Sequence, residues 1–297
     1  MRMRALTLSR LGDPEALAVV EDVPDPVPGT GDVSLRVGAA GYTPTELTWD
    51  STAVDRSGHD RLPSIPCYEV SGTVIGFGWG ATGFAVGDEV FGLTDWYRNG
   101  GAAELVCLEA RNLAGKPRSA DHVTSAALPL AGLTAWQALF VHGSLQEGQT
   151  LLVLGAAGGV GALAVQMAHT AGVRVLAVAR GKDRDAVLSL GADAFHEDAA
   201  EAEGVDLIFD TVGGDVLARA RAGTSARVVS VADPSDGLNY FVVEPDRETL
   251  ARIARSVDAG ELRPLVGLAA PLADSAEAVA RKERHEIGGK LVIDPTQ

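Results

Sequence analysis

The chain has 297 residues, a formal net charge of -15 at pH 7, and hydrophobic residues at 46% of its positions. This length provides enough apolar material for one large domain or two ordinary ones. The acidic balance disfavours nonspecific binding to nucleic acid and attraction to anionic lipids, so we expect neither a nucleic-acid nor a membrane partner.

The start of the chain, MRMRALTLSRLGDPEALAVVED, has no continuous apolar region and no small-residue cleavage site. It therefore gives no indication of a secretory signal. The only two cysteines, Cys67 and Cys107, are typical of free thiols in an intracellular protein and do not suggest a disulfide framework. On this basis we expect a cytoplasmic protein. The N-terminal third is also rich in proline, glycine and short β-like runs such as VSLRVGAA at 33–40, which predicts a β-rich domain.

The stretch LLVLGAAGGVGALAVQMA, residues 151–168, is uncharged and has about the length of a membrane span. Its four glycines argue against a single helix, because each costs about 1 kcal/mol relative to alanine in a helix interior. A buried strand at Leu151–Leu154, a tight glycine turn and a helix explain the string better. A membrane segment is therefore disfavoured.

The same alternation continues along the chain. Strand-like runs occupy residues 173–179, 205–210 and 226–232, and a helical stretch lies at residues 183–190. Strands that alternate with helices predict a doubly wound parallel sheet, and hence an α/β fold.

Residues 156–161, AAGGVG, fit A-x-G-x-x-G, a variant of the dinucleotide-binding fingerprint with Ala156 in the place of the first glycine. Gly158 lets the backbone approach a pyrophosphate closely, and Gly161 lets the helix pack tightly on the strand. Together with Gly159 and Val160 they open a helix, whose N-terminus attracts phosphate. The motif lies after a strand and before a helix, which favours cofactor binding over tight packing alone.

The second strand of this unit ends in AVARGKDRD, where an NAD-specific site would carry an acidic residue. Arg180 and Lys182 stand there and could pair with a 2′-phosphate, which predicts NADPH as the cofactor. The alternative is an ordinary solvated turn, since Asp183 and Asp185 are close by.

Five segments carry a resemblance to a known family. They are GFAVGDEVFGL at 83–93, AALPLAGLTAWQAL at 126–139, GAAGGVG at 155–161, FDTVGG at 209–214 and GGKLVI at 288–293. With them the chain resembles the medium-chain dehydrogenase/reductase superfamily, of the zinc-independent NADPH:quinone oxidoreductase or enoyl reductase type.

The resemblance implies an α/β fold: a Rossmann doubly wound parallel sheet plus a GroES-like β-rich catalytic domain. Residues 1–118 and 262–297 would form the catalytic domain, and residues 119–261 would form the nucleotide-binding domain. The expected substrate site is the cleft between the two domains. The resemblance also implies a homodimer through an edge strand of the nucleotide-binding domain.

Zinc-dependent relatives take metal ligands from three places, which in this sequence hold Thr43, Tyr68 and Leu130. These residues cannot form a stable zinc site, and two cysteines cannot build a four-cysteine structural lobe. We therefore expect no metal. Without a Lewis acid to stabilise an alkoxide, hydride transfer to an electrophilic acceptor remains, and quinones and α,β-unsaturated carbonyls are such acceptors.

Three residues are candidates for the catalytic role. Thr43 and Thr48 stand where quinone reductases of the family often carry asparagine and tyrosine, and this departure weakens the case for ordinary quinone reduction. The resemblance places Tyr68 near the reacting centre, where its hydroxyl could donate to an enolate or a quinone oxygen. Alternatively, Tyr68 only fills the vacated metal pocket.

The resemblance implies further cofactor contacts. Thr134 would lie near the nicotinamide, Val212 and Gly213 beside the ribose, and the backbone of Phe241 and Val242 near the carboxamide. Lys290 matches the lysine of the closing G-K-x-V motif, with a surface charge as the alternative reading. Where relatives often carry a tyrosine near the adenosine phosphate, this chain has His196 and Asp198, and an acidic group there would weaken the preference for NADPH.

The resulting expectation is an NADPH-dependent reductase of a small-molecule quinone or activated alkene. One alternative is an enoyl reductase for a polyketide-type or other specialised intermediate. A second alternative, from another class, is a non-catalytic NADPH-binding sensor or structural protein, which would bind NADPH without turnover.

Overall fold

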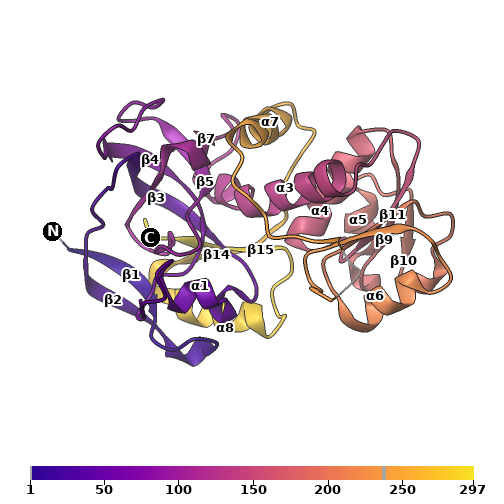
Figure 1. The fold of residues 1–297 in the computed structure, drawn as a ribbon, viewed down its shortest axis with the longest axis horizontal. Helices are drawn as coiled ribbons and strands as arrows, with labels where there is room; N and C mark the ends of the chain where they lie inside the picture. Colours follow the sequence, from indigo (N-terminus) through magenta and orange to yellow (C-terminus); the bar gives the residue numbers. More distant parts are fainter. Residues whose placement is uncertain (1, 236–238) are drawn as a thin grey trace. The chain divides into compact units, whose positions relative to one another are not determined.

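The computed structural model describes residues 2–235 and 239–297. The chain divides into two compact units, which are coloured along the sequence in Figure 1. The first unit comprises Met1–Leu130, Pro245–Asp258 and Val266–Gln297. The second unit comprises Ala131–Glu244 and Ala259–Leu265.

The first unit is built on a seven-stranded sheet with the order β14-β15-β3-β4-β5-β7, and β6 pairs with β3 off this path. Its neighbours are antiparallel except for β14 and β15, which are parallel. The strands are β3 (Asp32–Tyr42), β4 (Glu69–Phe77), β5 (Glu89–Leu93), β6 (Leu105–Glu109), β7 (Leu113–Gly115), β14 (Val266–Pro271) and β15 (Lys290–Asp294). A separate antiparallel pair consists of β1 (Arg2–Leu8) and β2 (Leu17–Pro24). The β-rich domain predicted from the sequence is confirmed.

The long strand β3 organises this unit because it pairs with β4, β6 and β15. Its register with β4 shifts between Val37 and Ala39, and Gly72 of β4 lies at the shift. A Cβ on Gly72 would lie 2.4 Å from the carbonyl oxygen of Arg36, so only glycine fits there. The helices of the unit are α1 (Asp50–Ala53), α2 (His122–Ala126), α7 (Arg247–Asp258) and α8 (Ser275–Glu283).

The second unit contains a six-stranded sheet with the order β10-β9-β8-β11-β12-β13, in which every pair is parallel. The strands are β8 (Thr150–Leu154), β9 (Arg174–Val178), β10 (Ala194–His196), β11 (Leu207–Asp210), β12 (Arg227–Ser230) and β13 (Asn239–Tyr240). Numbered in chain order this is 3-2-1-4-5-6, the order of dinucleotide-binding sheets. The predicted doubly wound parallel sheet is therefore confirmed.

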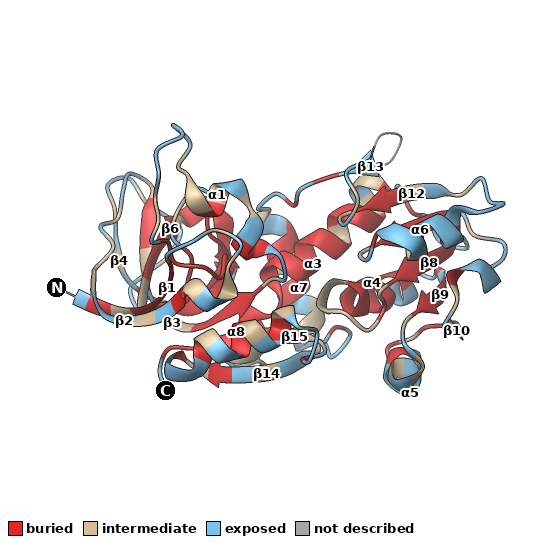
Figure 2. Cartoon of the chain, turned by 90° about the horizontal axis from the view of Figure 1, so that it is seen from below, coloured by how far each residue is buried: buried red, intermediate tan, exposed pale blue. Residues whose placement is uncertain are grey.

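Three helices follow strands of this sheet: α4 (Gly159–Thr170), α5 (Arg184–Leu188) and α6 (Gly214–Arg221). The helix predicted at residues 183–190 is shorter, because a 3₁₀ turn at Gly181–Asp183 precedes α5. The helix α3 (Pro129–Trp136) runs into the π-helix η4 (Gln137–His142). Figure 2 shows that β8 and α4 are largely buried, as expected for a central strand and the helix that covers it.

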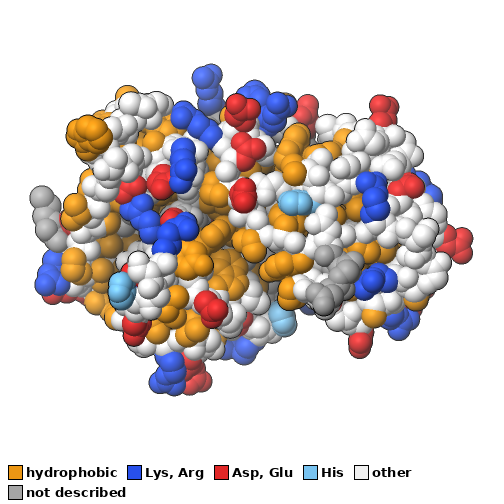
Figure 3. Space-filling view, in the orientation of Figure 1, with side chains coloured by type: hydrophobic (Ala, Val, Ile, Leu, Met, Phe, Trp, Pro, Cys, Tyr) orange, Lys and Arg blue, Asp and Glu red, His pale blue; other side chains and the backbone are white. Residues whose placement is uncertain are grey.

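The uncharged stretch at residues 151–168 is β8, a turn and the larger part of α4. Within the described ranges, no helix combines the length and apolarity that crossing a bilayer requires. Basic and acidic side chains are interspersed on the face shown in Figure 3.

The predicted boundaries at residues 118 and 261 differ from the observed division. The segment after residue 118 stays with the first unit because Ala126 and Ala127 pack against Ala39 and Val292. Likewise α7 stays with the first unit, where it packs against β7.

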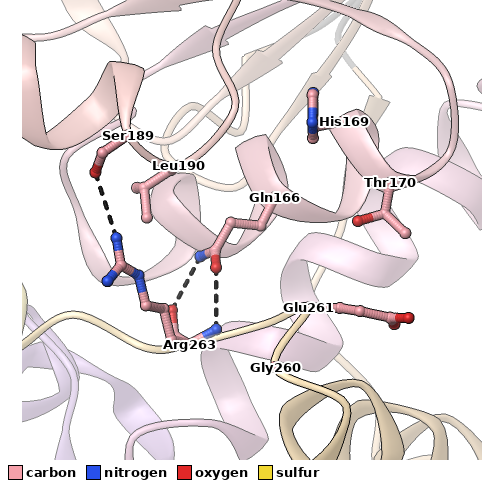
Figure 4. Close-up of a pocket in the computed structure, with 8 residues that line it drawn as sticks. All are labelled: Gln166, His169, Thr170, Ser189, Leu190, Gly260, Glu261 and Arg263. Atoms are coloured by element: carbon pink, nitrogen blue, oxygen red, sulfur yellow. Dashed lines mark hydrogen bonds between the residues drawn. The ribbon is translucent and has the colours of Figure 1, made fainter.

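Residues Ala259–Leu265 instead belong to the second unit. Gln166 of α4 donates to the carbonyl oxygen of Arg263 and accepts from its N–H, at 2.9 and 3.0 Å. The guanidinium of Arg263 also donates to Ser189. These residues line one side of an open pocket of about 270 Å³, drawn in Figure 4.

Candidate dinucleotide and acceptor sites

The turn after β8 depends on Gly155, which has φ +82°. A Cβ on Gly155 would lie 2.4 Å from Thr211 Oγ1 and 2.9 Å from Val212 Cγ2. Gly155 therefore makes the tight turn, directly before Ala156, and a cofactor contact of Ala156 stays a prediction. Ala156 is fully buried behind the turn. The sequence did carry the signal, since Gly155 directly follows the aliphatic run.

The other two glycines of the motif allow backbone segments to approach closely. A Cβ on Gly161 would lie 2.2 Å from the carbonyl oxygen of Gly155, and one on Gly158 would lie 3.1 Å from the same atom. Gly158 is the N-cap of α4 and offers no capping side chain. The N–H groups of the first turn, from Gly159 to Gly161, are thus left for a ligand, and the helix dipole favours an anion there.

The loop after β11 lies beside this turn, because β11 pairs directly with β8. The buried carboxylate of Asp210 accepts from the N–H groups of Val212 and Gly213 at 3.0 and 2.9 Å, and from Ser230 Oγ at 2.7 Å. Asp210 therefore fixes the loop, while the side chain of Val212 stays 49% exposed. The structure thus brings Val212 and Gly213 to the glycine turn, at the edge where ligands bind in sheets of this order.

Thr134 lies on α3 and is 4% exposed. Its hydroxyl has no hydrogen-bond partner among the described residues, which is unusual for a buried polar group. The segment that carries Phe241 and Val242 runs beside α3 and η4, since Gln137 donates to the carbonyl oxygen of Glu244 and accepts from its N–H. Phe241 stacks on His142 with ring centroids 4.2 Å apart, and Val242 is 60% exposed.

The basic pair lies at the end of β9. Arg180 forms an ion pair with Asp183 at 3.4 Å, and Lys182 is exposed. Glu197, which follows β10, accepts a hydrogen bond from the Gly181 N–H at 3.2 Å. Sequence reasoning pointed to Asp198, but that carboxylate pairs with Arg219, and Glu197 and Asp183 are the acidic groups beside the basic pair.

These features fit a dinucleotide. The second unit contains a glycine turn in which backbone segments approach closely, a helix N-terminus with free N–H groups, and the buried Thr134 hydroxyl, which has no partner among the described residues. The glycine turn and α4 would hold the pyrophosphate, the loop of Val212 would lie beside a ribose, and Thr134 offers a hydrogen bond to a polar group such as a carboxamide.

The first unit contains a buried polar cluster around Lys290. Lys290 is 4% exposed, and its ammonium forms an ion pair with Glu69 and donates to Thr43 Oγ1 at 3.3 Å. Glu69 also accepts from the Leu130 N–H at 3.0 Å. The surface-charge alternative for Lys290 is therefore wrong. The contacts observed for its ammonium lie within the first unit, and its predicted role in cofactor binding stays a prediction.

A second buried carboxylate, Glu46, belongs to the same cluster. It accepts from the Cys67 N–H at 2.7 Å and from the Thr43 N–H at 3.2 Å. Burial raises the pKa of Glu46 to about 8, although both N–H groups and Lys290 oppose this shift. Glu46 is therefore largely protonated at neutral pH. The sequence alone gave no sign of this role for Glu46.

Tyr68 is fully buried. Its hydroxyl lies 3.0 Å from Thr52 Oγ1, and its ring stacks on Trp49 with centroids 5.8 Å apart. Trp96 packs edge-on against both rings. Because the Tyr68 hydroxyl is engaged by Thr52 inside this aromatic cluster, the geometry favours packing over proton donation. Burial also raises the pKa of the Tyr68 hydroxyl.

The two threonine candidates differ. The Thr48 hydroxyl is engaged, because it donates to the carbonyl oxygen of Thr45 at 2.7 Å. Thr43 is half-buried, and its oxygen accepts from Lys290, which leaves its own hydroxyl hydrogen without an acceptor among the described residues. In the described part of the chain, no group of three or more histidine, cysteine, aspartate or glutamate residues could hold a metal ion.

Two family models match the chain. The model described as an alcohol dehydrogenase GroES-like domain matches residues 29–118, and the model described as a zinc-binding dehydrogenase matches residues 182–293. Although the second description names zinc, the three ligand places of this chain hold Thr43, Tyr68 and Leu130.

Individual relatives agree with these models. A 2-methylene-furan-3-one reductase from Solanum lycopersicum is 29% identical over 99% of this chain and 79% of its own. A chloroplastic NADPH-dependent alkenal/one oxidoreductase from Arabidopsis thaliana is 29% identical over 99% of this chain and 80% of its own. The quinone oxidoreductase from Coxiella burnetii has a similar structure, with a TM-score of 0.88, 26% identity, and coverage of 98% of this chain and 99% of that chain.

The fold, the glycine turn and these similarities define a nicotinamide-dependent oxidoreductase. The chain belongs to the medium-chain dehydrogenase/reductase superfamily, and within it to the zinc-independent quinone oxidoreductase type.

Proposed function

We propose that this protein is an NADPH-dependent reductase that delivers hydride to an α,β-unsaturated carbonyl or a quinone. The observation that carries the proposal is the dinucleotide cradle of the second unit, with its unpartnered Thr134 hydroxyl. The names of the relatives from Solanum lycopersicum, Arabidopsis thaliana and Coxiella burnetii support the class of acceptor.

A bound nicotinamide cofactor supplies the hydride. The second unit holds it by the glycine turn and the N-terminus of α4, and Thr134 orients it by a hydrogen bond. This orientation is the main contribution of the protein, since a well-placed donor and acceptor react far faster than free ones. Stabilisation of the negative charge that develops on the acceptor oxygen requires hydrogen-bond donors or cations close to it.

The preference for NADPH rests on Arg180 and Lys182, whose charges would attract a 2′-phosphate. Asp183 and Glu197 lie beside these residues and oppose that attraction. We therefore propose a moderate preference for NADPH over NADH. A homodimer is proposed on the family resemblance, and a cytoplasmic location on the two free cysteines. Sedimentation that shows a monomer at micromolar concentration would refute the dimer.

Cofactor oxidation with a mixed panel of enones, quinones and enoyl thioesters tests the function. We expect absorbance at 340 nm to fall with at least one enone or quinone, and faster with NADPH than with NADH. Turnover only with the thioesters would identify an enoyl reductase. Tight NADPH binding without turnover on any member of the panel would favour the non-catalytic alternative.

A further inference from the structure

Three strand ends bring Lys290, Thr43 and Glu69 together. Lys290 begins β15, which pairs with the end of β3 through Leu291 and Tyr42. Thr43 is the residue after β3, and Glu69 begins β4 opposite Gly41. A Cβ on Gly41 would lie 2.7 Å from Glu69 Cγ, so the glycine leaves room for the glutamate side chain. The sheet register therefore fixes the position of this group.

The cluster is layered from the interior outward. The carboxylate of Glu69 is fully buried, and the ammonium of Lys290 lies against it. The ammonium also donates to the hydroxyl of half-buried Thr43 at 3.3 Å. An ammonium has only donors to offer, so the threonine oxygen must be the acceptor in that contact. The outermost group is thus a hydroxyl whose own hydrogen is free to donate, with a cation behind it.

We propose that Lys290 and Thr43 form the proton-donating pair of the reaction, with Lys290 acting through the Thr43 hydroxyl. This inference rests on the proposed reductase function. When hydride adds to the β-carbon of an enone, the electron pair of the carbon–carbon double bond moves and the carbonyl becomes an enolate. The enolate oxygen takes the Thr43 hydroxyl proton, and Lys290 returns a proton to the threonine oxygen. The enol then becomes the saturated ketone by taking a proton from water at its α-carbon and releasing its hydroxyl proton, and Lys290 recovers its proton from solvent after the ketone leaves.

A purely structural role makes a different prediction. If Lys290 only neutralises Glu69, removal of both charges together should leave turnover intact, because no charge is then buried without its partner. If Lys290 supplies the proton, the doubly neutral protein should fold and still lack its acid. The ionisation state of a bound phenol distinguishes a structural from a proton-donating role of Lys290 in a binding measurement, without turnover.

The first experiment uses cofactor-free protein and 4-nitrophenol, whose phenolate resembles an enolate and absorbs visibly where the phenol does not. We expect wild type and Thr43→Ser to bind the phenolate in preference to the phenol. Thr43→Val and Lys290→Met should reduce this preference by about tenfold or more, the loss expected when a charge-assisted hydrogen bond is removed. A wild-type protein that shows no preference for the phenolate, or variants that match wild type, would overturn the assignment of Lys290 and Thr43 as the proton-donating pair.

Lys116→Met is the matched control for the lysine. The Lys116 side chain is 9% exposed against 6% for Lys290, and it forms an ion pair with Glu89 in the same unit. Its ammonium donates to the carbonyl oxygens of Pro117 and Ala120 and has no link to Thr43. Phenolate binding should therefore be unchanged in this variant. A loss equal to that of Lys290→Met would show that any buried lysine produces the effect, and would overturn the assignment.

The second experiment compares Glu69→Gln with the double variant Glu69→Gln/Lys290→Met. We expect the double variant to lose about 100-fold in kcat relative to the single variant, with little change in KM, because a positioned acid typically contributes that much. If the single and the double variant are both active and have equal kcat values, the proton-donating role of Lys290 and Thr43 is overturned and the proposed function stands. A wild-type protein inactive on the whole panel would instead overturn the proposed function, whatever the phenolate result.

Discussion

The carboxylate of Glu197 accepts a hydrogen bond from the backbone N–H of Gly181, with 3.2 Å between nitrogen and oxygen. This contact joins the ends of the parallel neighbours β9 and β10, and it places a negative charge beside Arg180 and Lys182. An NADPH 2′-phosphate held by the basic pair would therefore meet the repulsion of Glu197.

Replacement of Glu197 by glutamine should raise the affinity for NADPH about threefold to tenfold, with little change for NADH, because only NADPH carries the 2′-phosphate. Titration of cofactor fluorescence gives both values of Kd. Glu201→Gln is the control, since Glu201 lies four residues away and faces His196. An equal effect of both variants would indicate a general change in charge and contradict the local role of Glu197.

Replacement of Arg180 by methionine should weaken NADPH binding about tenfold and leave NADH binding unchanged, since a charge-assisted contact to phosphate is lost. The same fluorescence titration measures this. Equal losses for the two cofactors would mean that Arg180 supports the fold of the turn and does not recognise the phosphate.

Replacement of Gly161 by alanine should destabilise the second unit by about 1–3 kcal/mol, as overpacking does, and abolish tight cofactor binding. The new Cβ would lie 2.2 Å from the backbone oxygen of Gly155, and backbone cannot move aside as a side chain can. Thermal unfolding and NADPH titration measure the two effects. At Gly115 a Cβ would meet no atom within 4 Å, so Gly115→Ala should change neither the thermal stability nor the NADPH affinity. Normal cofactor binding by Gly161→Ala would contradict the role of the glycine turn in holding the cofactor.

Glu46 should make the protein less stable as the pH rises. Its pKa is about 8 when folded against 4.5 for a free carboxyl, so between these values the folded state holds one more proton than the unfolded state. The stability that Glu46 contributes is complete below about pH 4.5 and is lost as the pH rises through 8, at up to about 1.4 kcal/mol per pH unit. Chemical denaturation at several pH values should show a flatter profile for Glu46→Gln than for wild type. If the stability of the two proteins depends equally on pH, the raised pKa of Glu46 is contradicted.

The architecture of the second unit could be predicted because its signals are local. Each buried strand is a short aliphatic run, and the glycine turn lies next to the first of them in sequence. The strand at residues 173–179 is β9 (Arg174–Val178), shorter by one residue at each end. Gly155 was not among the predicted cofactor contacts, although it makes the turn directly before Ala156.

The remaining features depend on contacts that sequence spacing does not show. Glu197 meets Gly181 only because β9 and β10 are neighbours, and Lys290 meets Thr43, 247 positions away, only through the pairing of β15 with β3. The complete burial of Tyr68 follows from its packing with Trp49 and Trp96. For Lys290 the tertiary structure excludes a surface charge, and for Tyr68 its contacts favour packing.

Transfer of deuterium from 4-deuterated NADPH to an enone tests the central claim most directly. Both C4 epimers would be incubated with the protein and an enone that it consumes, and the product would be analysed by mass spectrometry. The account predicts that one epimer leaves deuterium on the β-carbon of the saturated ketone, with the second new hydrogen taken from solvent. Consumption of NADPH with no deuterium on product carbon from either epimer would contradict hydride transfer to the alkene.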